Sequence, residues 1–291
     1  MPHARKLLTG LAVLMLVALA WREPPGEADA PAAPAIAGAP VPAPDAPGPA
    51  TGSRERPDVT GASRDDTLGT RREASAGRRA RFDFYLLSLT LEPAFCEDGN
   101  QRIRQCRALD GESFARTPLV LHGLWPEDRV PGRYPRDGPG PPLALQPATR
   151  AALAPWMPGM REGLDRHEWR SHGTCSGLDD DAYFRHAIAG TRVANLAIGE
   201  AIRRHAGSGT TAAALRAAAD RARPGYGENV VFVCRNLRSD DPAKRRRPHL
   251  LEVRVCLDDD GPDGAPGRLL RCADVGRRDQ GCGGTFMIDD V

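Results

Sequence analysis

"FDFYLLSLTL", residues 82–91, combines aromatic and branched apolar residues with a single charge, which is typical of a buried β-strand. A second strand is predicted for "TPLVLHGLWP", residues 117–126, where Pro126 ends the pairing pattern. The polar segment "CEDGNQRIRQC", residues 96–106, lies between the two strands, and its end cysteines are close enough in sequence to close a loop. We therefore expect these two strands to form part of one sheet.

The rest of the chain predicts helices and further strands. The acidic residues from Asp179 and the stop at Gly207 indicate a long helix, and residues 210–222 and 147–157 indicate a second helix and a short one. Four more strands are expected at residues 229–234, 249–258, 267–272 and 284–289. Since helices and strands do not alternate strictly, we expect an α+β fold with a largely antiparallel β-sheet packed by helices.

The first 80 residues are expected to lie outside this fold. A basic start, an apolar run and the small residues 18–20 predict a signal peptide over residues 1–20, cleaved after Ala20. Residues 21–80 are rich in Pro, Ala, Gly and Arg and predict a disordered linker, because so little apolar surface cannot offset the entropy of ordering. Residues 81–291 then form one domain of a secreted or periplasmic monomer without stable membrane insertion.

Charge and cysteine content narrow the function classes. The chain has 40 Lys and Arg against 38 Asp and Glu, so a broad basic face for nucleic acid is not expected, and any such contact should be local. All seven cysteines lie after residue 95 and none forms a C-x-x-C pair, which favours disulfides over structural zinc. Because seven is odd, at least one cysteine is free or pairs between chains.

The stretch "LDRHEWRSHGTC", residues 164–175, raises three possibilities: a metal site, a proton-transfer site or core packing. In an α-helix, His167 and His172 would lie about 140° apart, which makes a shared metal difficult. Glu168 and His172 are four residues apart and would share a face. The spacing therefore favours proton transfer or transition-state stabilisation, and no metal or cofactor is expected.

His122 in "LVLHGLWP" supplies a second candidate imidazole, followed by Gly123, which allows close backbone approach. Two histidines suit the cleavage of RNA by its own 2′-OH, a reaction that needs a base for that hydroxyl and an acid for the departing 5′-oxygen. The developing phosphorane charge needs nearby donors or cations. DNA lacks the 2′-OH, so selectivity for RNA would follow from the chemistry itself.

"LHGLWP" (121–126) and "HEWRSHGTC" (167–175) resemble, in sequence, order and spacing, the two active-site segments of the ribonuclease T2 family of secreted endoribonucleases. "LLSLTLEPAFC" (86–96) and "CGGTFMID" (282–289) resemble the family's N-terminal and C-terminal parts. The resemblance covers about residues 82–289 and implies single-stranded RNA as substrate, with 2′,3′-cyclic phosphates and then 3′-phosphates as products.

The resemblance also implies a role for each matching residue. His172 would be the general base, His122 the general acid, and Glu168 would stabilise the transition state. His167 would bind phosphate and Trp125 would shape the substrate cleft.

The chain departs from the family pattern at residue 171. The family usually carries Lys before the second catalytic histidine, and here that position is Ser171, with Arg170 beside it as a further candidate for substrate contact. A weakened or inactive member that binds RNA or a protein is therefore the alternative. A metallohydrolase using His167, Glu168 and His172 is a third hypothesis.

The family pattern also bears on the cysteines, since it pairs the cysteine at the position of Cys175 with one between the two active-site segments, and this chain has none there. The resemblance thus implies the pairs Cys96–Cys106, Cys234–Cys282 and Cys256–Cys272, with Cys175 free.

Overall fold

Strand β1, Phe84–Leu91, is the segment expected as a buried strand, and all eight of its residues are buried. The computed structural model describes residues 80–130 and 132–291. The predicted signal peptide and nearly all of the predicted linker lie outside these residues.

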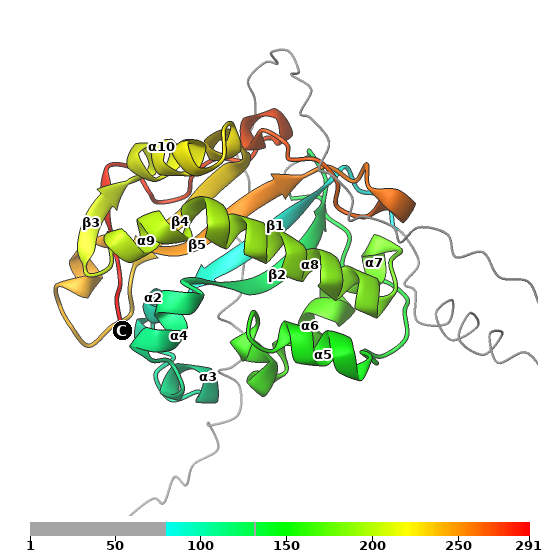
Figure 1. Cartoon of the computed structure of the whole chain (residues 1–291), viewed down its shortest axis with the longest axis horizontal. Helices are drawn as coiled ribbons and strands as arrows, with labels where there is room; N and C mark the ends of the chain where they lie inside the picture. Colours follow the sequence, from blue (N-terminus) through cyan, green and yellow to red (C-terminus); the bar gives the residue numbers. More distant parts are fainter. Residues whose placement is uncertain (1–79, 131) are drawn as a thin grey trace, which may run out of the picture.

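A six-stranded sheet forms around β1, with the order β2-β1-β5-β6-β3, and β4 also pairs with β5 (Figure 1). Every pairing between its strands is antiparallel except that of β5 with β6, which confirms the predicted α+β fold with a largely antiparallel sheet. The other strands are β2 (Leu119–Glu127), β3 (Ser208–Thr211), β4 (Val230–Asn236), β5 (Pro248–Leu257) and β6 (Thr285–Ile288).

The predicted long helix is continuous but changes its winding along its length. It consists of α8 (Asp180–Ala194), the π-helical turn η3 (Asn195–Gly199) and α9 (Glu200–Arg204). The Asp179 carboxylate caps α8 by accepting a hydrogen bond from Ala182 N at 2.6 Å, which satisfies one of the free donors of the first turn. The other two predicted helices are α10 (Ala212–Ala222) and α5 (Pro147–Leu153).

Short helical segments complete the described chain. They are α2 (Glu92–Glu97), α3 (Arg104–Arg107), α4 (Gly111–Arg116), η1 (Pro158–Glu162), α6 (Leu164–Glu168), η2 (Trp169–Gly173), α7 (Thr174–Ser176), η4 (Tyr226–Asn229), η5 (Lys244–Arg246), η6 (Pro262–Gly264) and η7 (Cys272–Val275).

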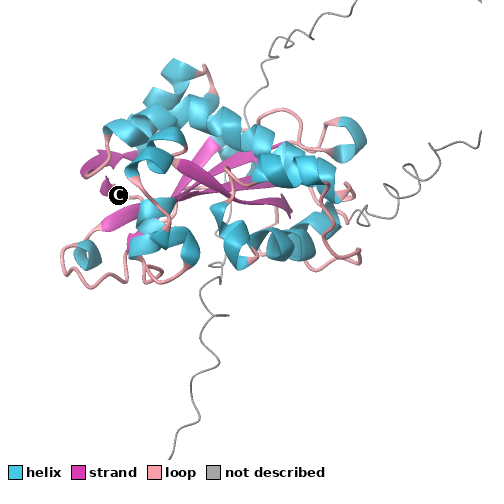
Figure 2. Cartoon of the chain, turned by 60° about the horizontal axis from the view of Figure 1, so that its bottom comes forward, coloured by secondary structure: helices cyan, strands magenta, loops and turns pink. Residues whose placement is uncertain are grey.

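Apolar side chains pack on both faces of the sheet. The larger core lies between one face and the helices, where α8 runs across β1 and β2, as Figures 1 and 2 show. A smaller cluster of buried side chains includes Phe84, Leu86 and Trp125 together with Cys256 and Cys272. Burial on both faces explains why β1 reads as a nearly continuous apolar run instead of an alternating one.

The strands differ from the prediction at two places. The strand expected at residues 267–272 reduces to a single bridge between Leu257 and Leu269, because the chain leaves the end of β5 and turns into η7. Strand β3 was not predicted, since "SGTT" has no apolar run and its strand conformation depends on pairing with β6.

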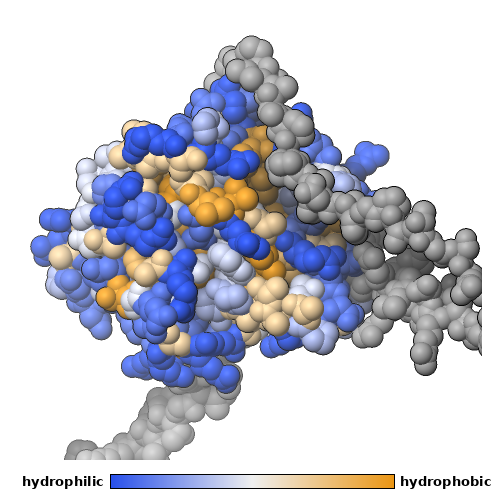
Figure 3. All heavy atoms as spheres, in the orientation of Figure 1, coloured by the Kyte–Doolittle hydropathy of each residue, from blue (hydrophilic) through white to orange (hydrophobic). Residues whose placement is uncertain are grey.

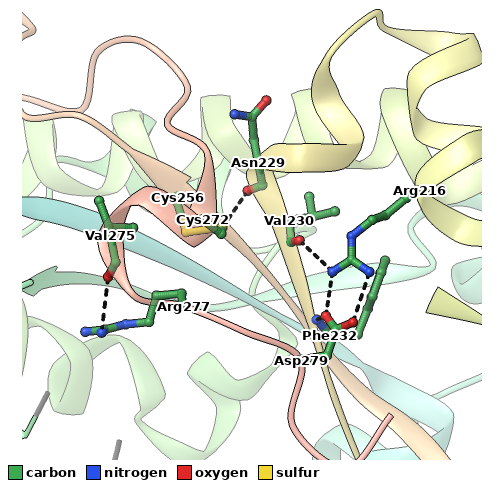
Figure 4. Close-up of a disulfide and its surroundings, with 9 residues drawn as sticks. All are labelled: Arg216, Asn229, Val230, Phe232, Cys256, Cys272, Val275, Arg277 and Asp279. Atoms are coloured by element: carbon green, nitrogen blue, oxygen red, sulfur yellow. Dashed lines mark hydrogen bonds and ion pairs between the residues drawn. A yellow bond between two sulfur atoms is a disulfide. The ribbon is translucent and has the colours of Figure 1, made fainter. Parts of the chain in front are cut away.

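The structure contains the three disulfides that the resemblance implies: Cys96–Cys106, Cys234–Cys282 and Cys256–Cys272. Cys175 is buried and forms no disulfide within the described chain. Cys256–Cys272 joins β5 to the segment that leads toward β6 (Figure 4).

The same C-terminal segment is attached to the sheet through the Asp279 carboxylate (Figure 4). The Arg216 guanidinium donates to both oxygens of Asp279, at 2.6 and 2.9 Å, and stacks 5.1 Å from the Phe232 ring centre. Asp279 also accepts a hydrogen bond from Phe232 N at 2.9 Å. One carboxylate therefore fixes α10, β4 and the C-terminal segment relative to one another.

Hydrophilic side chains dominate the face seen in Figure 3, with smaller apolar patches between them. No helix in the described part of the chain is both long and apolar enough to cross a membrane.

The Asp279→Ala substitution should lower the free energy of unfolding by about 2 kcal/mol, because Phe232 N loses this acceptor and the Arg216 guanidinium keeps only the Val230 oxygen. Glu200→Ala is the matched control, since Glu200 pairs with Arg203 in an exposed i,i+3 pair that contributes little. Urea unfolding of both variants measures the difference, and equal stabilities would contradict the structural role of Asp279.

Candidate active site

His122 lies at a β-bulge in β2. The pairing with β1 runs from Glu127 to Gly123, opposite Ser88, and resumes with Leu121 opposite Leu89, so His122 is the extra residue. A bulge locally redirects a side chain, and bulges are frequent beside active sites. Here it brings the imidazole into a buried position, where Nδ1 lies 2.9 Å from Oε1 of Glu252.

Glu252 and Arg254 of β5 were not identified from the sequence. They lie two residues apart on one face of β5, on the side from which His122 reaches Glu252, and Arg254 Nε donates to Glu252 Oε2 at 2.8 Å. Burial raises the pKa of Glu252, but Arg254 and His122 lower it by more, so the carboxyl is ionised. The sequence offered one signal for these residues: the apolar run "LLEVRVCL" contains two charged residues at alternate positions. Charged side chains on one face of a buried strand need partners, which indicates a polar site beside that face.

Glu168, the last residue of α6, reaches the same place from the neighbouring helix. Trp125 Nε1 donates to Glu168 Oε2 at 2.8 Å, and the other carboxylate oxygen lies 3.7 Å from His122 Nε2. Burial raises the pKa of Glu168 to about 7. A Cβ on Gly123 would lie 2.0 Å from Glu168 Oε2, so only glycine leaves room for this hydrogen bond.

The second histidine segment is not a regular α-helix. The chain passes from α6 into the π-helical turn η2, which gives wider winding than the α-helical spacing assumed from the sequence. In a π-turn the hydrogen bonds run from residue i to i+5, so the angle of 140° expected between His167 and His172 in a regular α-helix does not apply. Glu168 bonds to Trp125 and pairs with His122, and it makes no hydrogen bond to His172.

His172 is buried, with its ring centre 5.5 Å from that of Trp125. Its Nδ1 atom has no hydrogen-bond partner among the described residues. Burial lowers the pKa of His172 well below 6.5, and the positive charges of Arg136, His122 and His167 lower it further. The neutral imidazole is therefore the stable form in mildly acid and neutral solution.

The pKa of His122 is shifted in the opposite direction. Burial lowers it, but the hydrogen bond and the charge of Glu252, together with the charge of Glu168, raise it above 6.5 overall. One imidazole is thus prepared to accept a proton and the other to donate one. Two titratable groups with pKa values pushed apart are the pattern of an acid and base pair.

The remaining candidates surround this pair. Trp125 is 3% exposed and packs against both imidazoles, with the Arg254 guanidinium 5.1 Å from its ring centre. His167 is half-buried, and burial and then the charge of Arg170 lower its pKa. The Arg170 side chain itself is exposed.

Ser171 is buried against a loop. Its backbone oxygen accepts a hydrogen bond from Asp137 N at 3.0 Å, and its hydroxyl lies 3.4 Å from Asp137 Oδ1. Position 171 therefore faces the segment before α5, which the sequence had not connected with the site.

In the described part of the chain, no group of three or more His, Cys, Asp or Glu side chains is arranged to hold a metal ion. The metal hypothesis requires His167, Glu168 and His172 to converge on one ion. The Glu168 carboxylate instead contacts His122 and Trp125.

Comparisons with known proteins identify the family of the chain. The model of the Ribonuclease T2 family matches residues 82–264. A ribonuclease of Aeromonas hydrophila is 30% identical over 193 residues, which cover 64% of this chain and 77% of that protein. Ribonuclease I of Escherichia coli is 31% identical over 135 residues, which cover 35% of this chain and half of the relative.

Solved structures share the fold. Ribonuclease MC1 from bitter gourd seeds superposes with a TM-score of 0.53 at 24% identity, covering 71% of this chain and all of that one. RNase NT, solved in complex with 5′-AMP, gives a TM-score of 0.52 at 20% identity, covering 72% of this chain and 99% of that one. With two histidines, a buried glutamate and a tryptophan gathered on this fold, the chain belongs to the ribonuclease T2 family.

Proposed function

We propose that this protein is a metal-independent endoribonuclease that cleaves single-stranded RNA by transphosphorylation. Membership of the ribonuclease T2 family supports RNA endonuclease activity. The observation that carries the mechanism is the buried pair His122 and His172, which both pack against Trp125 and whose pKa values are shifted in opposite directions.

In the first step, neutral His172 accepts the proton of the 2′-OH, and O2′ attacks the adjacent phosphorus to form a phosphorane. Protonated His122 then gives its proton to O5′ as the P–O5′ bond breaks. The products are a 2′,3′-cyclic phosphate and a free 5′-hydroxyl. In the slower second step, water takes the place of the 5′-hydroxyl, the two histidines exchange roles, and a 3′-phosphate forms.

Glu252 and Glu168 set the charge of His122 in different ways. The ionised Glu252 accepts a hydrogen bond from Nδ1–H, so it fixes the ring orientation and leaves Nε2 to carry the transferable proton. Glu168 lies beside that Nε2 and is held by Trp125, where it stabilises the imidazolium in the ground state and supports the charge that develops during transfer.

The proposal includes export of the protein from the cytosol and action as a monomer. The basic, apolar and small-residue pattern of residues 1–20 supports export, and three disulfides suit an oxidising compartment. The nucleotide complex of RNase NT supports RNA as the substrate class.

Ser171 favours the alternative of a weakened family member that binds RNA or a protein without efficient cleavage. A serine supplies a hydrogen bond but no charge for the phosphorane. The retention of His122, Glu168 and His172 in one buried cluster favours the enzyme.

His122→Ala and His172→Ala should each lower the rate of RNA cleavage in EDTA by about 10²- to 10⁴-fold, because each removes a proton-transfer group. His205→Ala, in the last turn of the long helix, is the matched control and should retain full activity. Single-stranded RNA digestion with mass spectrometry of the ends measures both rate and cyclic phosphate. Binding of RNA without cleavage by the unsubstituted protein would support the alternative, and dependence on zinc would support the metallohydrolase.

The pH–rate profile should be bell-shaped, rising as His172 loses its proton below pH 6.5 and falling as His122 loses its proton above pH 6.5. Glu252→Gln removes the charge that raises the pKa of His122, so the alkaline limb should move to lower pH by about one unit or more.

Asp289→Asn is the control for this shift, because Asp289 holds the buried His249 imidazole at 2.6 Å in a similar pair outside the site. Its alkaline limb should stay in place. An unmoved limb in Glu252→Gln would show that Glu252 has no influence on the general acid.

A further inference from the structure

Arg136 lies in the segment between β2 and α5, and the fold brings this segment onto the π-turn that carries His172. The next residue, Asp137, donates its backbone N–H to the Ser171 oxygen at 3.0 Å. This hydrogen bond joins the residue after Arg136 to the residue before His172, although Arg136 and His172 are 36 positions apart in the sequence.

The backbone beside Arg136 is held tightly. A Cβ on Gly138 would lie 2.9 Å from Cys175 Sγ and 3.0 Å from the Thr174 oxygen, so the segment packs directly against η2 and α7. Asp137 has a φ of 49°, in the left-handed region that costs energy for a residue other than glycine. Strain of this kind persists only where the surrounding contacts determine the conformation.

The Arg136 side chain is exposed and oriented. Its guanidinium lies 5.6 Å from the Tyr134 ring centre, and Nη1 is 3.4 Å from the Tyr134 hydroxyl. Its positive charge lowers the pKa of His167, Glu168 and His172, so the three site groups on α6 and η2 all lie within its field.

A cation at the phosphorane would favour the reaction proposed above, because negative charge accumulates on its equatorial oxygens. Arg254 is ion-paired with Glu252 and stacked on Trp125, with 12% of its side chain exposed. Ser171 has no charge and faces Asp137. Arg136 is exposed, lies on a backbone segment hydrogen-bonded to η2, and is near enough for its charge to lower the pKa of both His167 and His172.

We propose that Arg136 is a catalytic residue that binds the scissile phosphate and stabilises the phosphorane, supplying from a separate loop the positive charge that position 171 lacks. This inference rests on the proposed function. A guanidinium suits the role because it presents paired donors to two phosphate oxygens.

Arg136→Gln should lower kcat for single-stranded RNA by about 10- to 100-fold, with a smaller change in KM, because the charge is needed most in the transition state. Arg136→Lys should retain part of the activity. Arg133→Gln, an exposed arginine in the same segment, is the matched control and should behave as the unsubstituted protein.

A pH profile separates this role from a structural one. His172 is faced by His122 of β2, His167 of α6 and Arg136, and each positive charge lowers its pKa. Removing Arg136 should therefore move the acid limb to higher pH, whereas loss of packing would lower the rate at every pH. Inorganic phosphate binding, followed through the His172 NMR signals, should weaken in Arg136→Gln and not in Arg133→Gln.

The outcomes distinguish the two proposals. If the unsubstituted protein cleaves RNA, the His122 and His172 variants are inactive, and Arg136→Gln matches Arg133→Gln in kcat and acid limb, the Arg136 inference is wrong and the proposed function stands. If the unsubstituted protein does not cleave RNA, the proposed function and this inference both fail.

Discussion

The hydrogen bond between His122 and Glu252 determines the site, because it joins the edge strand β2 to β5 across β1. A buried carboxylate is costly unless it is paired, and Glu252 has two partners, the imidazole and the Arg254 guanidinium. Its ionisation gives His122 a proton at Nδ1 and raises the pKa of the ring. The sheet register therefore sets the protonation state of the proposed general acid.

Trp125 connects this pair to the second histidine segment. It donates to Glu168, packs against both imidazoles and carries Arg254 on its ring face. Since it is almost fully buried, we expect it to shape a substrate cleft only through the groups it positions. The two imidazoles differ in pKa because carboxylates face His122, whereas cations and apolar surface surround His172.

The fold and much of the candidate site could be predicted from local patterns. β1 is apolar on both faces, the long helix has an acidic start and Asp179 as its cap, and the two histidine segments have a specific sequence. These features depend on residues that are close in sequence. The strand that was not predicted, β3, depends on distant residues, because it has no apolar pattern of its own and is a strand only through its pairing with β6.

The site shows the same division. The sequence by itself determined which residue types were available: His122, Trp125, Glu168 and His172 in two recognisable segments, with a serine at position 171. Only the tertiary structure decided their partners. Sheet register places Glu252 beside His122, the π-turn changes the spacing between His167 and His172, and a backbone hydrogen bond holds the loop that carries Arg136 against η2. Such contacts join residues far apart in the chain, so they cannot be predicted from local sequence patterns.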